Sequence, residues 1–171
     1  METERFILRP YKKSDAIFIY NNWASDPEVP KYLTWNPHRS IEDTYEILNI
    51  WLEEEKNGPT YRFCIVPKGS DEPIGCIDMV SRNNDSCDIG YVLSRKYWNK
   101  GIMTEVCKAY VNYLFENGFN EIFIRAVDKN IGSNRVIEKC GFTFTHKEVG
   151  PLSRFKPDEI VTCNCYKKVR N

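Results

Sequence analysis

No apolar run in this sequence approaches the 18 residues that a membrane-spanning helix needs, and the mean hydropathy is -0.52. The charged start Met1-Glu2-Thr3-Glu4-Arg5 has no apolar stretch behind it, which argues against a secretory signal peptide. There is also no excess of either charge, because 24 basic side chains balance 24 acidic ones. A general binder of nucleic acids or membrane surfaces is therefore disfavoured. We expect a soluble, cytoplasmic protein without nucleic-acid or membrane partners.

The seven cysteines form no CxxC pair, and the chain has only two histidines, His38 and His146. An odd number of cysteines with no histidine beside them argues against a disulfide framework and against a zinc site. We expect most of the thiols to be small buried hydrophobes in a reducing compartment, and we expect no metal. A nucleophilic cysteine is the less favoured alternative, and both histidines are expected to be structural.

The length of 171 residues predicts a single domain, 1–171, with one substantial core. Turn signals and runs of strand-forming residues predict seven strands, and helical spacing predicts about four helices. The expected strands are 6–9, 61–66, 74–80, 87–93, 121–127, 142–146 and 160–167, and the expected helices begin near Ser14, Ser40, Met103 and Asn130 or Ser133. The predicted fold class is α+β, with a mixed and mostly antiparallel seven-stranded sheet flanked by about four helices.

Charge is sorted along the chain although its sum is zero. Residues 1–94 carry 10 basic and 16 acidic side chains, whereas residues 95–171 carry 14 basic and 8 acidic ones. An acidic half would suit a cationic substrate, and a basic half would suit an anionic one. A chance distribution over a mixed surface explains the same counts equally well.

The stretch from Asp88 to Glu105, DIGYVLSRKYWNKGIMTE, carries the clearest chemical signal. A predicted strand runs through a basic loop into a helix N-terminus, where unpaired backbone N–H groups and the helix dipole favour an anion. Gly101 allows the backbone to approach that anion closely. The loop lacks both the Gly-Lys-Ser/Thr of a P-loop and the GxGxxG of dinucleotide-binding folds. These residues alone indicate a site for a pyrophosphate-sized anion, or an ordinary strand–helix turn.

The segment Trp98-Asn-Lys-Gly-Ile-Met-Thr-Glu105 resembles the acetyl-coenzyme A (acetyl-CoA) loop of the Gcn5-related N-acetyltransferase (GNAT) superfamily. Three more motifs are similar to its RimJ/RimL-like branch, which includes ribosomal-protein N-terminal acetyltransferases: Arg5-Phe-Ile-Leu-Arg-Pro10 with Ser14-Asp15, Asp88-Ile-Gly-Tyr91, and Asn130-Ile-Gly-Ser133 leading to Glu138-Lys-Cys-Gly-Phe142. The motifs occur in the family's order over nearly the whole chain. The resemblance implies the acyl-CoA N-acyltransferase fold and transfer of acetyl from acetyl-CoA to a primary amine by direct attack.

The resemblance also implies which residues hold the cosubstrate acetyl-CoA. These are Val92, Leu93, Trp98, Asn99, Lys100, Gly101, Ile102, Met103, Thr104, Asn130 and Ser133. Arg135 and Lys139 are candidates for the 3′-phosphate end. Two positions depart from the family pattern: Met103 stands where a small residue is usual, and Ile137 stands where many relatives have a tyrosine that acts as general acid.

Two side chains are implied to be catalytic. Asp88 occupies the place on the central strand where relatives often have a carboxylate base, and as a short side chain it would act through a water. Ser133 is expected near the departing thiolate, with helix capping as its alternative role. The tetrahedral oxyanion would accept a hydrogen bond from a backbone N–H near Val92 or Leu93.

The acceptor pocket is expected from the N-terminal part of the chain, because aromatic rings and carboxylates can hold a cationic amine. The candidate residues are Asp26, Glu28, Tyr32 and Trp35. A protein N-terminus, a polyamine, an aminoglycoside or another small amine all fit, and the protein is expected to be a monomer or a homodimer. The alternative function is a non-catalytic acetyl-CoA-binding or protein-interaction module of the same fold.

Overall fold

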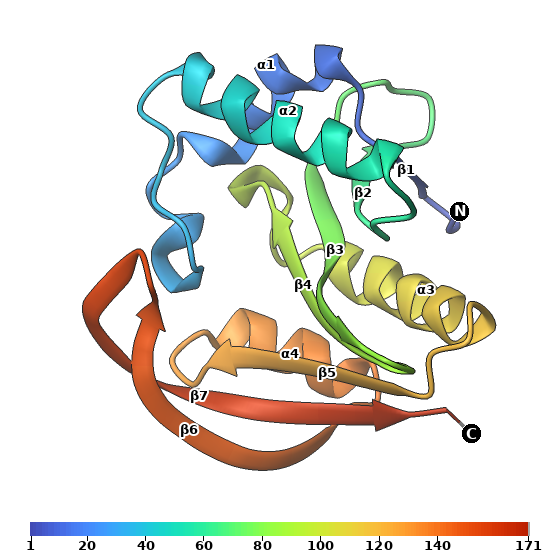
Figure 1. Ribbon diagram of the computed structural model, residues 1–171, viewed down its shortest axis with the longest axis vertical. Helices are drawn as coiled ribbons and strands as arrows, with labels where there is room; N and C mark the ends of the chain where they lie inside the picture. The colour runs from blue at the N-terminus through green and yellow to red at the C-terminus, as the bar shows by residue number, and fades with distance from the viewer. Residues whose placement is uncertain (171) are drawn as a thin grey trace.

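The computed structural model describes residues 1–170 and arranges them around one sheet of order β1-β2-β3-β4-β5-β7-β6 (Figure 1). Its strands are β1 (Phe6–Arg9), β2 (Phe63–Pro67), β3 (Gly75–Asn83), β4 (Ser86–Leu93), β5 (Glu121–Val127), β6 (Thr143–Ser153) and β7 (Lys156–Val169). The α-helices are α1 (Ala16–Ile19), α2 (Ile41–Lys56), α3 (Ile102–Glu116) and α4 (Ile131–Lys139). The β4–β5 pair is parallel and the other five pairs are antiparallel, so the expected fold class is confirmed.

Helices cover the sheet on both faces, and each face has its own apolar cluster. The larger cluster joins α3, with Tyr110 and Leu114 fully buried, to the centre of the sheet. The smaller cluster packs α1 and α2, including Leu48, against the other face. All seven cysteines are free thiols and six of them are buried, as the sequence predicted. Within residues 1–170, no helix is both long and apolar enough to cross a membrane.

The parallel strands β4 and β5 stay together for only three residue pairs. The last of these pairs is Asp88 with Phe123, and beyond it the strands diverge, as Figure 1 shows. Residues 89–93 therefore have β3 on one side and no strand on the other. A free strand edge inside a sheet leaves backbone N–H and C=O groups that a ligand can pair with.

The first helix and the last hairpin differ from the sequence prediction. The helix expected from Ser14 is interrupted, because α1 passes into a π-helical turn at Tyr20–Ala24, whose extra residue breaks the helical spacing. Trp23 is consequently buried while Ile17 is exposed. The strands predicted at 142–146 and 160–167 are longer in β6 and β7, since these strands are held by cross-strand pairing over mostly exposed residues that give little apolar signal.

The tip of the β6–β7 hairpin contacts the loop that follows α1. Lys156 Nζ, which is buried, donates to the Pro30 carbonyl oxygen at 2.9 Å, and Ser153 Oγ donates to the Thr34 carbonyl oxygen at 2.7 Å. Figure 1 shows this hairpin end beside the N-terminal loop. The loop that carries Tyr32 is thus fixed from the C-terminal side.

Candidate active site

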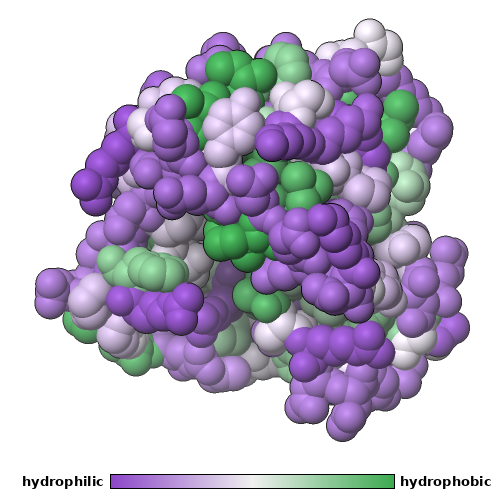
Figure 2. Space-filling view, turned by 45° about the horizontal axis from the view of Figure 1, so that its top comes forward, coloured by the Kyte–Doolittle hydropathy of each residue, from purple (hydrophilic) through white to green (hydrophobic). Residues whose placement is uncertain are grey.

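A cavity of about 660 Å³ opens where β4 and β5 part. Its walls come from the N-terminal loop, the free end of β4, the loop leading into α3, and the first turns of α4. The lining residues are Glu28, Val29, Lys31, Tyr32, Leu33, Tyr91, Val92, Leu93, 97–104, 130–133, Arg135, Val136 and Lys139. The space-filling view shows a hollow near the middle of a largely hydrophilic face, with apolar side chains at its edge (Figure 2). Every residue expected to hold acetyl-CoA lines this cavity.

The loop before α3 presents backbone N–H groups to the cavity. Asn99 and Gly101 have positive φ angles of 59° and 70°, and this conformation turns the chain sharply into α3. The first intrahelical bond runs from Glu105 N–H to the Gly101 carbonyl, so the N–H groups of residues 102–104 precede it and have no partner within the helix. Together with the helix dipole they supply the donors that an anion site at this loop would need.

Arg5 and Trp98 hold this loop in place. The Arg5 backbone N–H and Nε donate to the two oxygens of Glu105 at 3.0 and 2.7 Å, and its guanidinium reaches the Lys100 carbonyl at 3.3 Å. Trp98 Nε1 donates to the Leu93 carbonyl oxygen at 2.7 Å. Hydrogen bonds therefore hold the loop against the start of the chain and against β4 without a ligand.

The free edge of β4 offers a specific backbone donor. Ser94 N–H is bonded to the Ile74 carbonyl on the β3 side. Because N–H groups alternate along a strand, Leu93 N–H points away from β3, toward the gap between β4 and β5. The Leu93 carbonyl, which accepts the Trp98 indole N–H, lies on that same side.

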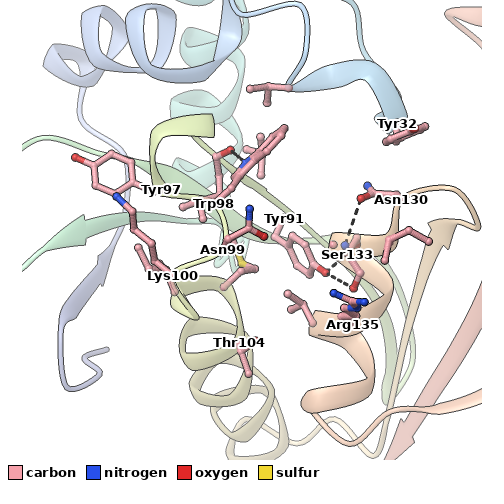
Figure 3. A pocket seen from close by; sticks show the side chains of 18 of the residues that line it. Tyr32, Tyr91, Tyr97, Trp98, Asn99, Lys100, Thr104, Asn130, Ser133 and Arg135 are labelled. Carbon is pink, nitrogen blue, oxygen red and sulfur yellow. Dashed lines mark hydrogen bonds between the residues drawn. The ribbon is translucent and has the colours of Figure 1, made fainter.

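The wall formed by α4 carries two hydroxyl groups in contact. Asn130 is the N-cap of α4, since its Oδ1 accepts from Ser133 N–H at 3.3 Å, so Ser133 itself is not the cap. The Tyr91 hydroxyl lies 2.9 Å from Ser133 Oγ, and Figure 3 shows the two side chains pointing toward each other. Burial raises the pKa of Tyr91 well above its usual value, so the phenol stays protonated.

A buried asparagine fixes α4 against the sheet. Asn134 Nδ2 donates to the carbonyls of Val127 and Asn130 at 2.9 and 2.8 Å, and its Oδ1 accepts from Asn164 Nδ2 and the Tyr166 hydroxyl. All four hydrogen bonds of one side-chain amide are used, which holds the first turn of α4 at a defined height above the sheet.

The charged lining residues are mostly basic. Lys31, Lys100, Arg135 and Lys139 contribute four cationic side chains, and Glu28 contributes the single carboxylate among the lining residues of the described chain. Glu28 Oε2 lies 3.9 Å from Lys31 Nζ. Tyr32 lies across from Asn130 in Figure 3. A polyanion with several phosphates matches such a cavity better than a polycation does.

Three residues expected at the site do not line the cavity. Asp88 is exposed at the last position where β4 pairs with β5, and its Oδ2 accepts from Ser81 Oγ at 2.5 Å. Asp26 forms an ion pair with Arg95, in which Asp26 Oδ2 lies 2.9 Å from Arg95 Nε. Trp35 packs against the smaller apolar cluster. Glu28 and Tyr32, from the same set of acceptor candidates, do line the cavity.

Tyr91 lines the cavity and contacts Ser133, although we did not expect it at the site from the sequence. The motif Asp88-Ile-Gly-Tyr91 contains the available signal, because Tyr91 is three residues from Asp88 in a strand and therefore faces the opposite side of the sheet. Arg5 was likewise part of a motif without a stated role. Its contact with Glu105 joins residues 100 positions apart, which spacing along the chain does not reveal.

Comparison with known proteins gives a consistent picture. The family model described as "Acetyltransferase (GNAT) domain" matches residues 5–143. The uncharacterized N-acetyltransferase p20 of Bacillus licheniformis is 30% identical over 143 residues, which cover 82% of this chain and 80% of p20. Two solved structures share the fold. Ribosomal-protein-S5-alanine acetyltransferase from Vibrio fischeri has a TM-score of 0.79 at 23% identity, covering 100% of this chain and 96% of that one. Spermidine N-acetyltransferase from Vibrio cholerae, in complex with CoA and spermine, has a TM-score of 0.80 at 16% identity, covering 96% and 95%.

Proposed function

Because the chain belongs to the acetyltransferase (GNAT) family, in its RimJ/RimL-like branch, we propose that it moves acetyl from acetyl-CoA to a single primary amine by direct attack. The chain is an acetyl-CoA-dependent acetyltransferase, and the proposal concerns the acceptor and the residues that act on it. One observation carries it: a single cavity joins the anion-binding loop, a free strand edge and the Tyr91–Ser133 hydroxyl pair.

The cofactor lies along three parts of the cavity in this proposal. The pyrophosphate accepts hydrogen bonds from the N–H groups of residues 102–104, and Gly101 allows its close approach. Arg135 and Lys139 attract the 3′-phosphate. The pantetheine amides pair with the free edge of β4, as an added strand would. The thioester then lies beside Leu93 and Ser133.

The chemistry needs three groups. The amine nitrogen attacks the thioester carbon, and the oxygen that becomes an oxyanion accepts a hydrogen bond from Leu93 N–H. The carbon–sulfur bond then breaks, and Ser133 Oγ donates a hydrogen bond to the departing thiolate, which takes up a proton from solvent water. The Tyr91 phenol, held protonated by burial, donates to Ser133 Oγ in this step, which leaves the Ser133 proton free for the thiolate.

An amine with a pKa near 10 is almost fully protonated at neutral pH, so a base must remove its proton. Asp88 is the proposed base and acts through water. It is at the last position where β4 pairs with β5, on the sheet face opposite Tyr91. Glu28 is the competing candidate because it lines the cavity directly.

The charges of the cavity favour an acceptor with one positive group. In this proposal Lys100, Arg135 and Lys139 lie at the phosphate end of the cavity, and the acceptor end has Tyr32 and one carboxylate, Glu28, which is itself near Lys31. Such an end can hold one ammonium group, by charge and by a cation–π contact, but offers little to a polyamine. A protein N-terminus or a small monoamine therefore fits best.

The test measures the release of free CoA thiol from acetyl-CoA in the presence of matched acceptors. A peptide with a free N-terminus, the same peptide with a blocked N-terminus, spermidine and an aminoglycoside form the panel. We expect release above the amine-free rate with the free peptide and little with spermidine. Acetyl-CoA binding in calorimetry without release for any acceptor would instead favour the non-catalytic binding module.

A further inference from the structure

A cluster of metal-ligand side chains lies outside the cavity, on the open face of the β6–β7 hairpin. In the sheet register His146 is opposite Cys165 and Glu148 is opposite Cys163, so His146, Glu148 and Cys165 share one face. The ligand atoms of these three residues all lie within 4.8 Å of one another. The neighbouring β7 residues Asn164 and Tyr166 contact Asn134 of α4, so the cluster faces away from α4.

The hydrogen bonds around His146 allow an arrangement that leaves a lone pair on Nε2. The Thr145 hydroxyl lies 3.0 Å from the Cys165 carbonyl oxygen, which can only accept, and 2.9 Å from His146 Nδ1. When the hydroxyl donates to the carbonyl, Thr145 Oγ1 accepts from Nδ1–H, and in the neutral ring Nε2 then has the free lone pair.

That lone pair faces another acceptor. His146 Nε2 lies 3.1 Å from Glu148 Oε1, and a carboxylate oxygen has no proton to donate. Two acceptors at this distance repel each other unless a cation lies between them, either a proton on the ring or a metal ion. The second oxygen of the same carboxylate lies 3.7 Å from Arg125 Nη1, which orients it and leaves Oε1 available.

Local backbone geometry builds this arrangement. The β6–β7 register shifts between Phe144 and His146, so Thr145 is an extra residue in β6, a β-bulge. Bulges redirect the side chains beside them. Here the bulge places the Thr145 hydroxyl between the Cys165 carbonyl and His146, as the outer hydrogen-bond partner that metal-bound histidines usually have.

We propose that His146 Nε2, Glu148 Oε1 and Cys165 Sγ bind one Zn²⁺ ion, with water completing the coordination. A nitrogen, a carboxylate oxygen and a thiolate sulfur are the ligand types of zinc sites, and the sulfur disfavours hard ions such as Mg²⁺. The His146 and Glu148 side chains are 58% and 52% exposed, so the ion can enter from solvent and a water can reach it. Cys165 becomes a thiolate on binding and releases its proton. The ion cross-links β6, which carries His146 and Glu148, to β7, which carries Cys165.

The test titrates the chelator-treated full chain with Zn²⁺ in calorimetry and with Co²⁺ in absorption spectroscopy. We expect one Zn²⁺ per chain and a sulfur-to-cobalt charge-transfer band. Cys165→Ser and His146→Gln should each lower Zn²⁺ affinity at least a hundredfold, and Cys165→Ser should remove the band. Thr145→Val, which only removes the outer hydrogen bond, should lower the affinity about 10- to 100-fold.

Cys163→Ser and His38→Gln are the matched controls, because they remove a thiol and an imidazole outside the cluster. Both should bind Zn²⁺ as the wild type does, and Mg²⁺ should not compete. The melting temperature of each metal-free variant shows whether it is folded. Zn²⁺ affinity that is equal in the wild type and Cys165→Ser, both folded, would overturn the proposal and leave His146–Glu148 as an imidazolium–carboxylate pair.

Discussion

The Tyr91 hydroxyl lies 2.9 Å from Ser133 Oγ and 3.2 Å from the Ser133 carbonyl oxygen, and it thereby links the free edge of β4 to the first turn of α4. Both residues line the cavity. Ile137, the position where the family resemblance implies a tyrosine, is fully buried in the core. The phenol that contacts Ser133 therefore comes from β4 and not from α4.

Replacing Ser133 tests the leaving-group interaction. A serine hydroxyl is a poor acid, so in our proposal Ser133 stabilises the thiolate by hydrogen bonding and does not supply a full proton. We expect Ser133→Ala to lower kcat about ten- to a hundredfold, or roughly 1.4–2.7 kcal/mol of transition-state stabilisation. Acetyl-CoA affinity, measured by calorimetry, should barely change because the phosphates bind elsewhere. A fall in affinity and melting temperature at unchanged kcat would mean that Ser133 is structural.

Tyr91 is expected to act through Ser133, and a double-mutant cycle can separate the two. Tyr91→Phe keeps the ring and removes the hydroxyl, and we expect kcat to fall by about tenfold or less. If the phenol only orients the serine, the double variant should be no slower than Ser133→Ala alone. Strictly additive losses in kcat would show instead that the phenol contacts the reacting atoms independently.

Gly101 is expected to control the approach of the pyrophosphate. At its φ of 70°, valine is strained, and its branched side chain would occupy space at the N-terminus of α3. We expect Gly101→Val to weaken CoA binding at least about tenfold in calorimetry. Gly118→Val is the matched control, since it imposes similar strain at φ 93° after the end of α3, outside the cavity lining. CoA binding equal to that of the wild type in Gly101→Val would rule out the loop assignment.

The identity of the base can be read from two isosteric variants. Asp88→Asn should lower kcat/KM about a hundredfold or more at neutral pH, and the loss should shrink at high pH, where the amine is already deprotonated. Glu28→Gln should mainly raise KM for the acceptor. If only Glu28→Gln changes the pH–rate profile, the carboxylate that lines the cavity is the base and Asp88 is removed from the mechanism.

The fold and the sharp turn into α3 could be predicted from sequence because their signals are local. The apolar periodicity of α3 and the glycine before it lie within one short segment, and each side chain there is positioned by its own helix or turn. The residues of an acceptor pocket are harder to predict from sequence. Asp26 and Trp35 have side chains that could bind an amine, but both contact other parts of the protein instead of lining the cavity. Asp26 pairs with Arg95, and Trp35 is partly buried against the smaller apolar cluster.

Contacts that depend on strand register could not be predicted. His146 and Cys165 are 19 positions apart, and only the pairing of β6 with β7, including the bulge at Thr145, brings them together. A one-residue shift in that register would place them on opposite faces. The expectation that no metal binds rested on sequence spacing, and the zinc proposal rests on register.

The contact between Arg5 and Glu105 gives a prediction for both binding and stability. Partial burial opposes ionisation of Glu105, but hydrogen bonds from Thr3 and Arg5 outweigh it and hold the pKa of Glu105 below its usual value. The pair is partly exposed, so Arg5→Ala should cost about 1 kcal/mol or less in free energy of unfolding. It should raise KM for acetyl-CoA more than it lowers kcat, because the guanidinium also fixes the Lys100 carbonyl in the loop.

The pH dependence of the same pair has a definite sign. A carboxyl whose pKa is lowered by folding contributes stability above its unfolded pKa, and that contribution is lost as pH falls through the folded pKa. The wild type should therefore be more stable than Glu105→Gln at neutral pH, and this difference should shrink as the pH falls below about 4.5. Urea unfolding of both proteins from about pH 7 to about pH 3 measures it. A difference that stays constant over this range would show that the Glu105 charge does not stabilise the loop.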